Sequence, residues 1–155
     1  MDWLRSATRR AAKFARLRPA EQWLVVRTFG LVLRVRLALW VLPFRRVREM
    51  ADRLGGRAVP ADAKRYSAED LTSFVFVAAS YIPQASCLTQ ALVADALLRR
   101  YGYEPVLKIG VSRPPGKAFQ AHAWVELDGK VVIGQVNTLE QYTPLPTLGP
   151  ATANK

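Results

Sequence analysis

Residues 86–102 read SCLTQALVADALLRRYG, and this stretch decides the fold. Ser86 is a favoured residue for a helix N-cap, and Gly102 is typical of the position that follows a helix C-terminus. Most side chains between them are apolar, and a helix that is apolar around most of its circumference belongs inside a domain. The sequence therefore predicts a buried helix that runs to about Arg100, with Cys87 in its first turn.

The chain after this helix changes to strand patterning. Three strands are predicted, at residues 106–111, 119–127 and 130–135. Asp128 and Gly129, between the last two strands, form the strongest short signal for a β-hairpin turn. Strand alternation places His122, Trp124 and Glu126 on one face of the sheet.

Further helices are predicted before the buried one, at about residues 20–42, 45–54 and 68–81. Pro19 and Pro43 bracket the first of them, and Ser67 is the N-cap candidate of the last. Two glycines and Pro60 make residues 55–66 the best linker candidate. Helices followed by antiparallel strands predict an α+β fold.

Length and charge divide the chain into two unequal parts. It has 155 residues and is 50% hydrophobic, which suits one globular domain or one domain plus a helical extension. Residues 1–57 hold 14 Lys and Arg against 4 Asp and Glu, a net charge of +10, whereas residues 58–155 hold 9 against 8, a net charge of +1. We expect a basic, amphipathic helical segment at 1–57 and a nearly neutral domain at 58–155. The composition argues against wholesale disorder, collagen and coiled coil.

The cysteine and histidine counts exclude several kinds of site. One Cys rules out an internal disulfide, and one Cys with one His rules out a zinc site built on the usual Cys and His ligand sets. The sequence predicts no metal and no cofactor. A lone thiol fits a reducing cytosol, and no secretory signal follows the basic start. We therefore expect a cytoplasmic protein.

The basic half of the chain has two interpretations. Its apolar segment, residues 23–44, is interrupted by Arg27, Arg34 and Arg36, which argues against a bilayer span. The arginines are either solvated side chains on helices that cover the core, or they dock to an anionic membrane surface or an acidic partner. Peripheral membrane association is therefore a further expectation. Nucleic acid is not expected as a partner, because the arginines lie within an apolar helix rather than on a polar face with stacking aromatics.

Cys87 and His122 are the candidates for catalysis. In the first turn of a helix, unpaired backbone N–H groups and the helix dipole stabilise a thiolate at Cys87. Taken alone, Cys87 is more simply a small buried hydrophobe, and His122 an ordinary strand histidine bonded to a carbonyl. Together, a cysteine at a helix start and a later strand histidine between small residues follow the chain order of papain-like thiol chemistry.

A family resemblance rests on four stretches taken in order, which are CLTQAL at 87–92, RRYG at 99–102, IGV at 109–111 and AHAWVELDG at 121–129. With them, residues 67–146 resemble the transglutaminase-like cysteine proteases of lasso-peptide biosynthesis. The leucine- and arginine-rich N-terminal helices also look like that family's N-terminal region. The resemblance implies a papain/transglutaminase-like core and a cysteine peptidase that removes the leader from a ribosomally made precursor peptide.

The resemblance also implies partners. The chain looks like the stand-alone form of the peptidase, which works with a separate leader-recognition protein, and an ATP-dependent cyclase closes the ring of the released core. In the family's Cys-His-Asp triad, Cys87 and His122 hold the first two places. By alignment, the place of the Asp falls at Gly134.

The third catalytic member is therefore open. A plain two-residue turn pairs His122 with Gln135, whose amide oxygen could orient the imidazole, whereas a one-residue bulge pairs His122 with Gly134. Glu140 is an alternative, and so is the absence of a third member. Asp128 lies about 20 Å from His122 along the strand and is interpreted as a turn residue.

The oxyanion hole is predicted at the backbone N–H of Cys87, with Gln84 or Ser86 as the second donor, although both are equally ordinary loop residues before a helix. Two other functions compete with the peptidase. The missing Asp motivates a catalytically idle peptide-binding module, and the +10 charge of residues 1–57 motivates a membrane-surface adaptor.

Overall fold

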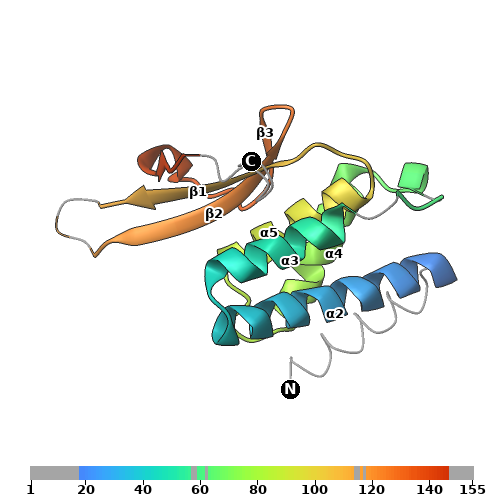
Figure 1. The fold of residues 1–155 in the computed structure, drawn as a ribbon. Helices are drawn as coiled ribbons and strands as arrows, with labels where there is room; N and C mark the ends of the chain where they lie inside the picture. Colours follow the sequence, from blue (N-terminus) through green and yellow to red (C-terminus); the bar gives the residue numbers. More distant parts are fainter. Residues whose placement is uncertain (1–17, 57–58, 62, 114–115, 117, 147–155) are drawn as a thin grey trace, which may run out of the picture.

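The computed structural model describes residues 18–56, 59–61, 63–113, 116 and 118–146. Helices and sheet form two layers (Figure 1). The described α-helices are α2 (Pro19–Val41), α3 (Phe44–Gly55), α4 (Ala68–Ser80) and α5 (Cys87–Arg100), and η1 (Ala63–Arg65) and η2 (Leu139–Gln141) are short 3₁₀ turns. The strands are β1 (Val106–Ser112), β2 (Gln120–Leu127), β3 (Lys130–Ile133) and β4 (Thr143–Pro144), in the antiparallel order β3-β2-β1-β4. The α+β prediction is confirmed.

The helices begin where their caps predict. The Ser67 hydroxyl accepts a hydrogen bond from the Asp70 backbone N–H, and the Asp70 carboxylate accepts one from the Ser67 backbone N–H. This reciprocal arrangement satisfies backbone donors that would otherwise be unpaired at the start of α4. Pro19 occupies the first turn of α2, where its missing N–H costs nothing.

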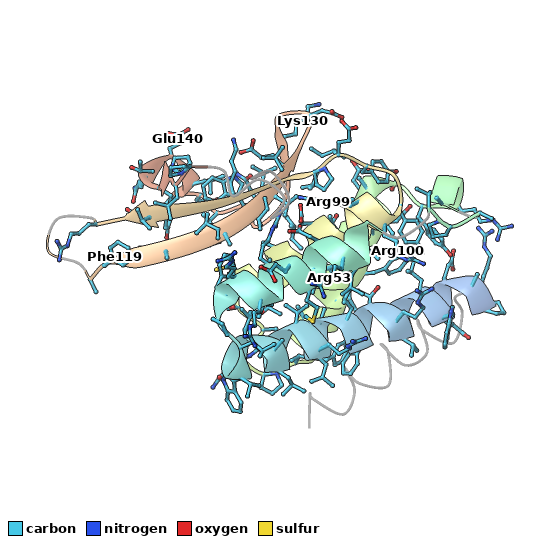
Figure 2. The ribbon with its side chains drawn as sticks, viewed as in Figure 1. Arg53, Arg99, Arg100, Phe119, Lys130 and Glu140 are labelled. Carbon is cyan, nitrogen blue, oxygen red and sulfur yellow. The ribbon has the colours of Figure 1, made fainter. Side chains whose placement is uncertain are left out.

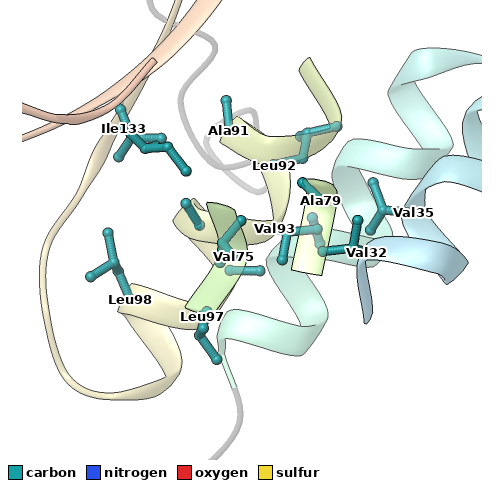
Figure 3. Close-up of a cluster of buried hydrophobic side chains, with 14 of the residues drawn as sticks. Val32, Val35, Val75, Ala79, Ala91, Leu92, Val93, Leu97, Leu98 and Ile133 are labelled. Atoms are coloured by element: carbon teal, nitrogen blue, oxygen red, sulfur yellow. The ribbon is translucent and has the colours of Figure 1, made fainter. Parts of the chain in front are cut away.

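Helix α5 is the centre of the core. It packs against every other described α-helix and against β1, β2 and β3. Figure 3 shows its buried side chains Leu92 and Val93 together with side chains from α2 and α4. The core includes Val32 and Val35 of α2 on one side and Ile133 of β3 on the other. The helices on both sides of residue 57 therefore share one core.

The domain boundary predicted between residues 57 and 58 remains a prediction. The hydrophobic core contains side chains from both sides of this boundary. Residues 1–17 of the predicted basic segment lie outside the described residues, as do residues 57, 58 and 62 of the predicted linker. None of the described helices is both long enough and apolar enough to cross a membrane.

A buried ionic network joins α3 to α5. The carboxylate of Asp95, which is 0% exposed, receives hydrogen bonds from Arg48 of α3 at 3.1 Å and from Arg99 at 3.0 and 3.2 Å. Asp52 lies 3.3 Å from Arg48 and 3.4 Å from Arg99 and completes the network. Burial raises the pKa of Asp95, and the two guanidinium groups offset part of that rise. This network was not predicted from the sequence, although Asp95, as an isolated carboxylate in an otherwise apolar helix, indicated a buried partner.

The β2–β3 hairpin turns at Asp128 and Gly129, as predicted, with φ of 50° and 76°. These positive angles are those of the type I′ turn that Asp-Gly favours. Val125 pairs with Ile133 but Glu126 pairs with Val131, so Val132 is an extra residue in β3. The predicted strand 130–135 ends early at Ile133. Strand β4, which pairs with β1, was not predicted.

Candidate active site

Cys87 is the first residue of α5, as predicted. The Ser86 side chain caps the helix by accepting a hydrogen bond from the Thr89 backbone N–H at 3.4 Å. Cys87 is a free, half-buried thiol that packs at the margin of the hydrophobic core. It lies at the positive end of the α5 dipole, where backbone N–H groups of the first turn are not used within the helix.

His122 lies on β2, and its ring is held on two sides. Its Nε2 is 2.7 Å from the backbone carbonyl oxygen of Gly134. A carbonyl only accepts hydrogen bonds, so Nε2 carries the proton and donates it, which leaves Nδ1 of the neutral ring as the acceptor. The ring also stacks on Trp124 at 6.2 Å between centroids and lies 5.4 Å from Tyr142.

Two glycines make room for this aromatic group. A Cβ at Gly110 would lie 2.9 Å from the Trp124 ring and 3.0 Å from Cβ of Tyr142. Gly134 has a φ of +86°, and a Cβ there would lie 2.7 Å from the carbonyl oxygen of Ala123. The position at which the resemblance led us to expect an Asp is therefore one that, in this conformation, strongly favours glycine.

Helix α5, which carries Cys87, packs on one face of the sheet, whereas the His122 side chain lies on the other face. Helix α5 packs against β2. Ala123 and Val125 of β2 belong to the core formed with α5, whereas His122 alternates with them and shares the other face with Trp124 and Tyr142. No hydrogen bond joins Cys87 Sγ to His122 among the described residues.

The other predicted site residues have structural partners or are exposed. Gln84 has a φ of 58°, and its side-chain oxygen accepts a hydrogen bond from Arg36 at 2.7 Å. Ser86 caps α5. Gln135 and Glu140 are both exposed, and Figure 2 places Glu140 on the side of the sheet away from the helices. Asp128 is in the hairpin turn, as interpreted from the sequence.

The bulge corrects the predicted strand register around His122. The extra residue lies in β3, so the ladder pairs His122 with neither Gln135 nor Gly134. The imidazole nevertheless reaches the carbonyl of Gly134, because the chain turns at Gly134 with a left-handed backbone. The group that orients His122 in the structure is therefore a main-chain carbonyl. This carbonyl could not be predicted from the sequence, because its position depends on the left-handed backbone conformation of Gly134.

Glu126 extends the row of His122 and Trp124 toward the hairpin. Its carboxylate accepts hydrogen bonds from the Trp124 indole N–H at 2.9 Å and from Lys108 Nζ at 2.7 Å. Burial raises the pKa of Glu126, but the hydrogen bonds from Lys108 and Trp124 and the charge of Lys108 outweigh it, so the pKa falls below its ordinary 4.5. The indole that supports the His122 ring is thereby fixed at its far end.

Residues 29–147 match the family model of the transglutaminase-like superfamily, and this match covers most of the chain. The chain therefore belongs to the transglutaminase-like superfamily. The match begins within α2, upstream of the predicted boundary at residue 58. Searches of curated proteins and of solved structures found no match.

No group of three or more His, Cys, Asp or Glu side chains that could hold a metal ion occurs in the part of the chain that the structure describes. The chemistry available at the candidate site is that of a thiol at a helix start and an imidazole with a fixed tautomer.

Proposed function

We propose that this protein is a cysteine peptidase that removes the leader from a ribosomally made lasso-peptide precursor. The observation that carries the proposal is the placement of the chain's single Cys and single His within a transglutaminase-like domain. Cys87 starts α5, and His122 lies on β2, which packs against that helix. The resemblance of residues 67–146 to lasso-peptide leader peptidases supplies the substrate class.

In the proposed reaction, His122 Nδ1 takes the proton of the Cys87 thiol. The thiolate sulfur attacks the carbonyl carbon at the leader–core junction, and the backbone N–H of Cys87 stabilises the oxyanion. The C–N bond breaks, the imidazolium protonates the departing core amine, and a thioester to the leader remains. Water, deprotonated by His122, then attacks the thioester, which releases the leader acid and restores the thiol.

This reaction requires His122 to approach Cys87 when the peptide binds. Because the His122 side chain lies on the sheet face away from α5, this approach requires β2 to rearrange against α5 and not only the shortening of a hydrogen bond. The Gly134 carbonyl supports this step by holding the proton on Nε2, so that Nδ1 remains the base. We propose this carbonyl as the group that orients the imidazole in place of the missing Asp and of Gln135.

The proposed partners follow from the same reaction. They are the precursor peptide, a separate leader-recognition protein and an ATP-dependent cyclase that uses the released core. The proposed location is the cytoplasm, where the thiol stays reduced.

The test is cleavage of the precursor peptide in the presence of the leader-recognition protein, followed by mass spectrometry. Wild-type protein should release free core, and Cys87→Ala and His122→Asn should each lower the rate at least about a hundredfold. Gln135→Ala is the matched control on the neighbouring loop and should retain the wild-type rate within about twofold, because this exposed side chain has no place in the proposed mechanism. If Cys87→Ala still releases core, the nucleophile is assigned wrongly.

A catalytically idle peptide-binding module is the second candidate. It is favoured by the absence of a Cys87–His122 hydrogen bond among the described residues and by glycine at the Asp position. Alkylation by iodoacetamide across pH distinguishes the two, because an activated thiol reacts at lower pH than an ordinary one. A wild-type protein that binds the precursor but never cleaves it, and whose Cys87 reacts like free cysteine, is the idle module.

A further inference from the structure

A groove lined by arginines lies between α2, α3 and the end of α5. It consists of two hollows of about 270 and about 450 Å³ that share Arg34 and Leu54. Figure 2 shows Arg53 on α3 and Arg100 near the end of α5, which border different hollows. We call this surface the arginine groove, and its charged lining residues are Arg27, Arg34, Arg46, Glu49, Arg53 and Arg100.

Most of the positive charge of the arginine groove has no counter-charge among the described residues. Within the part of the chain that the structure describes, the side chains of four of its arginines take part in no hydrogen bond or ion pair, namely Arg27, Arg34, Arg46 and Arg53. The one acidic lining residue, Glu49, has Arg45 as its partner at 3.4 Å, and Arg45 is not a lining residue. The two arginines of the buried network, Arg48 and Arg99, are by contrast paired with carboxylates.

Charge repulsion within this cluster of arginines is unfavourable, and binding of an anionic ligand relieves it. Like charges held close together repel each other, and the repulsion is stronger beside a low-dielectric wall than in open water. The lining includes apolar side chains, among them Leu31, Leu54 and Leu97, and no lysine. Guanidinium groups pair carboxylates in a bidentate way that lysine cannot reproduce.

We propose that the arginine groove binds an acidic peptide segment whose apolar side chains lie on its floor. Arg27 and Arg34 are seven residues apart on α2, and Arg46 and Arg53 are seven apart on α3, so each pair spans about 10.5 Å along its helix. About three residues of extended peptide cover that distance, so acidic residues three or four positions apart reach both members of a pair.

The shape and lining select this ligand over others. A concave groove with an apolar floor admits a chain with alternating side chains, whereas a flat bilayer surface would touch only its rim. Among the described residues, Tyr101 is the one aromatic side chain that lines the groove, so stacked nucleic-acid bases have no aromatic platform in this part of the chain. The proposal does not depend on the proposed peptidase activity, because Cys87 and His122 are not lining residues of either hollow.

Fluorescence anisotropy with a labelled peptide tests the proposal. In the probe peptide, every second residue is Glu and the residues between are Leu or Ser. The control peptide carries Gln in place of every Glu. The full-length protein should bind the Glu peptide only, and Arg34→Glu/Arg53→Glu should weaken Kd at least about tenfold. The matched control is Arg65→Glu/Arg113→Glu, which changes net charge equally at two other exposed arginines and should alter Kd less than about twofold. Thermal unfolding checks each variant, and Arg34→Gln/Arg53→Gln replaces the reversal if that variant does not fold.

Three results overturn the proposal. Equal weakening by the groove and control variants means that the peptide senses only net charge. Full displacement by inorganic phosphate at matched ionic strength means that the groove is a small-anion site. Binding of phosphatidylglycerol vesicles through Arg34 and Arg53, without binding of the Glu peptide, means that the surface serves a membrane. Loss of cleavage with intact peptide binding concerns the proposed peptidase and leaves this inference standing.

Discussion

Gly134 is the residue of the candidate site at which we expect an added methyl group to destabilise the fold most. Its φ of +86° is strained for any side chain, and a Cβ would lie 2.7 Å from a backbone oxygen of β2. We expect Gly134→Ala to lower the free energy of unfolding by about 2–4 kcal/mol, measured by urea denaturation. Gly134→Asp should be at least as destabilising, so placing a carboxylate at this position should not improve catalysis.

Two other glycines separate the causes of that loss. Gly116 has a φ of +72° but open space around its Cβ position, so Gly116→Ala measures the backbone strain alone, about 1 kcal/mol. Gly30 lies in α2 with nothing within 4 Å of its Cβ position, and Gly30→Ala should stabilise the protein by about 1 kcal/mol. A Gly134→Ala protein as stable as Gly116→Ala would show that the contact with β2 relaxes freely.

At the scale of elements, the buried carboxylate of Asp95 holds α3 against α5. Asp95→Asn removes the charge that compensates Arg48, whose side chain is 5% exposed and whose Nε has no hydrogen-bond partner among the described residues. We expect a loss of about 3–5 kcal/mol in urea denaturation, because Asp52 then remains the one carboxylate of the network for both Arg48 and Arg99, and net positive charge stays buried. Glu140→Gln, at an exposed position, is the control and should change stability by less than about 0.5 kcal/mol. A small loss at Asp95 would mean that water reaches Arg48.

The pairing of β1 with β2 should depend on pH through Glu126. Its pKa is lowered in the folded protein, so the unfolded chain takes up the proton first as pH falls below 4.5. The stability contributed by ionised Glu126 is therefore present above pH 4.5 and is lost as pH falls through the folded-state pKa. Urea unfolding at several pH values should show a shallower acid-side fall for Glu126→Gln than for wild type. Parallel curves would mean that Lys108 and Trp124 do not stabilise the carboxylate.

At the scale of the whole molecule, the helices before residue 57 should be required for folding. Val32, Val35 and Val47 are at most 1% exposed and pack in the same core as α4 and α5. A chain that begins at residue 58 would expose that face of the core to water. We therefore expect no cooperative thermal transition and poorly dispersed amide proton signals by NMR. A cooperatively folded fragment would support the predicted independent domain at 58–155.

Much of the fold could be predicted because its signals are local. Ser67, Ser86, Pro19 and the Asp128-Gly129 turn mark element ends through hydrogen bonds and backbone angles set within a few residues. Strand β4 is two residues long and carries no comparable pattern, so it was missed. The extra residue in β3 was also beyond sequence reasoning, because a bulge depends on how two strands pack.

The sequence by itself determined the class of fold, the start of α5 at Cys87 and the strand that carries His122, because caps, turns and hydrophobic periodicity act over short distances. Only the tertiary structure decided that the Gly134 carbonyl holds the imidazole, that Asp95 bridges two helices and that unpaired arginines gather in one groove. These three features join residues far apart in the chain, and their geometry follows from packing rather than from local pattern.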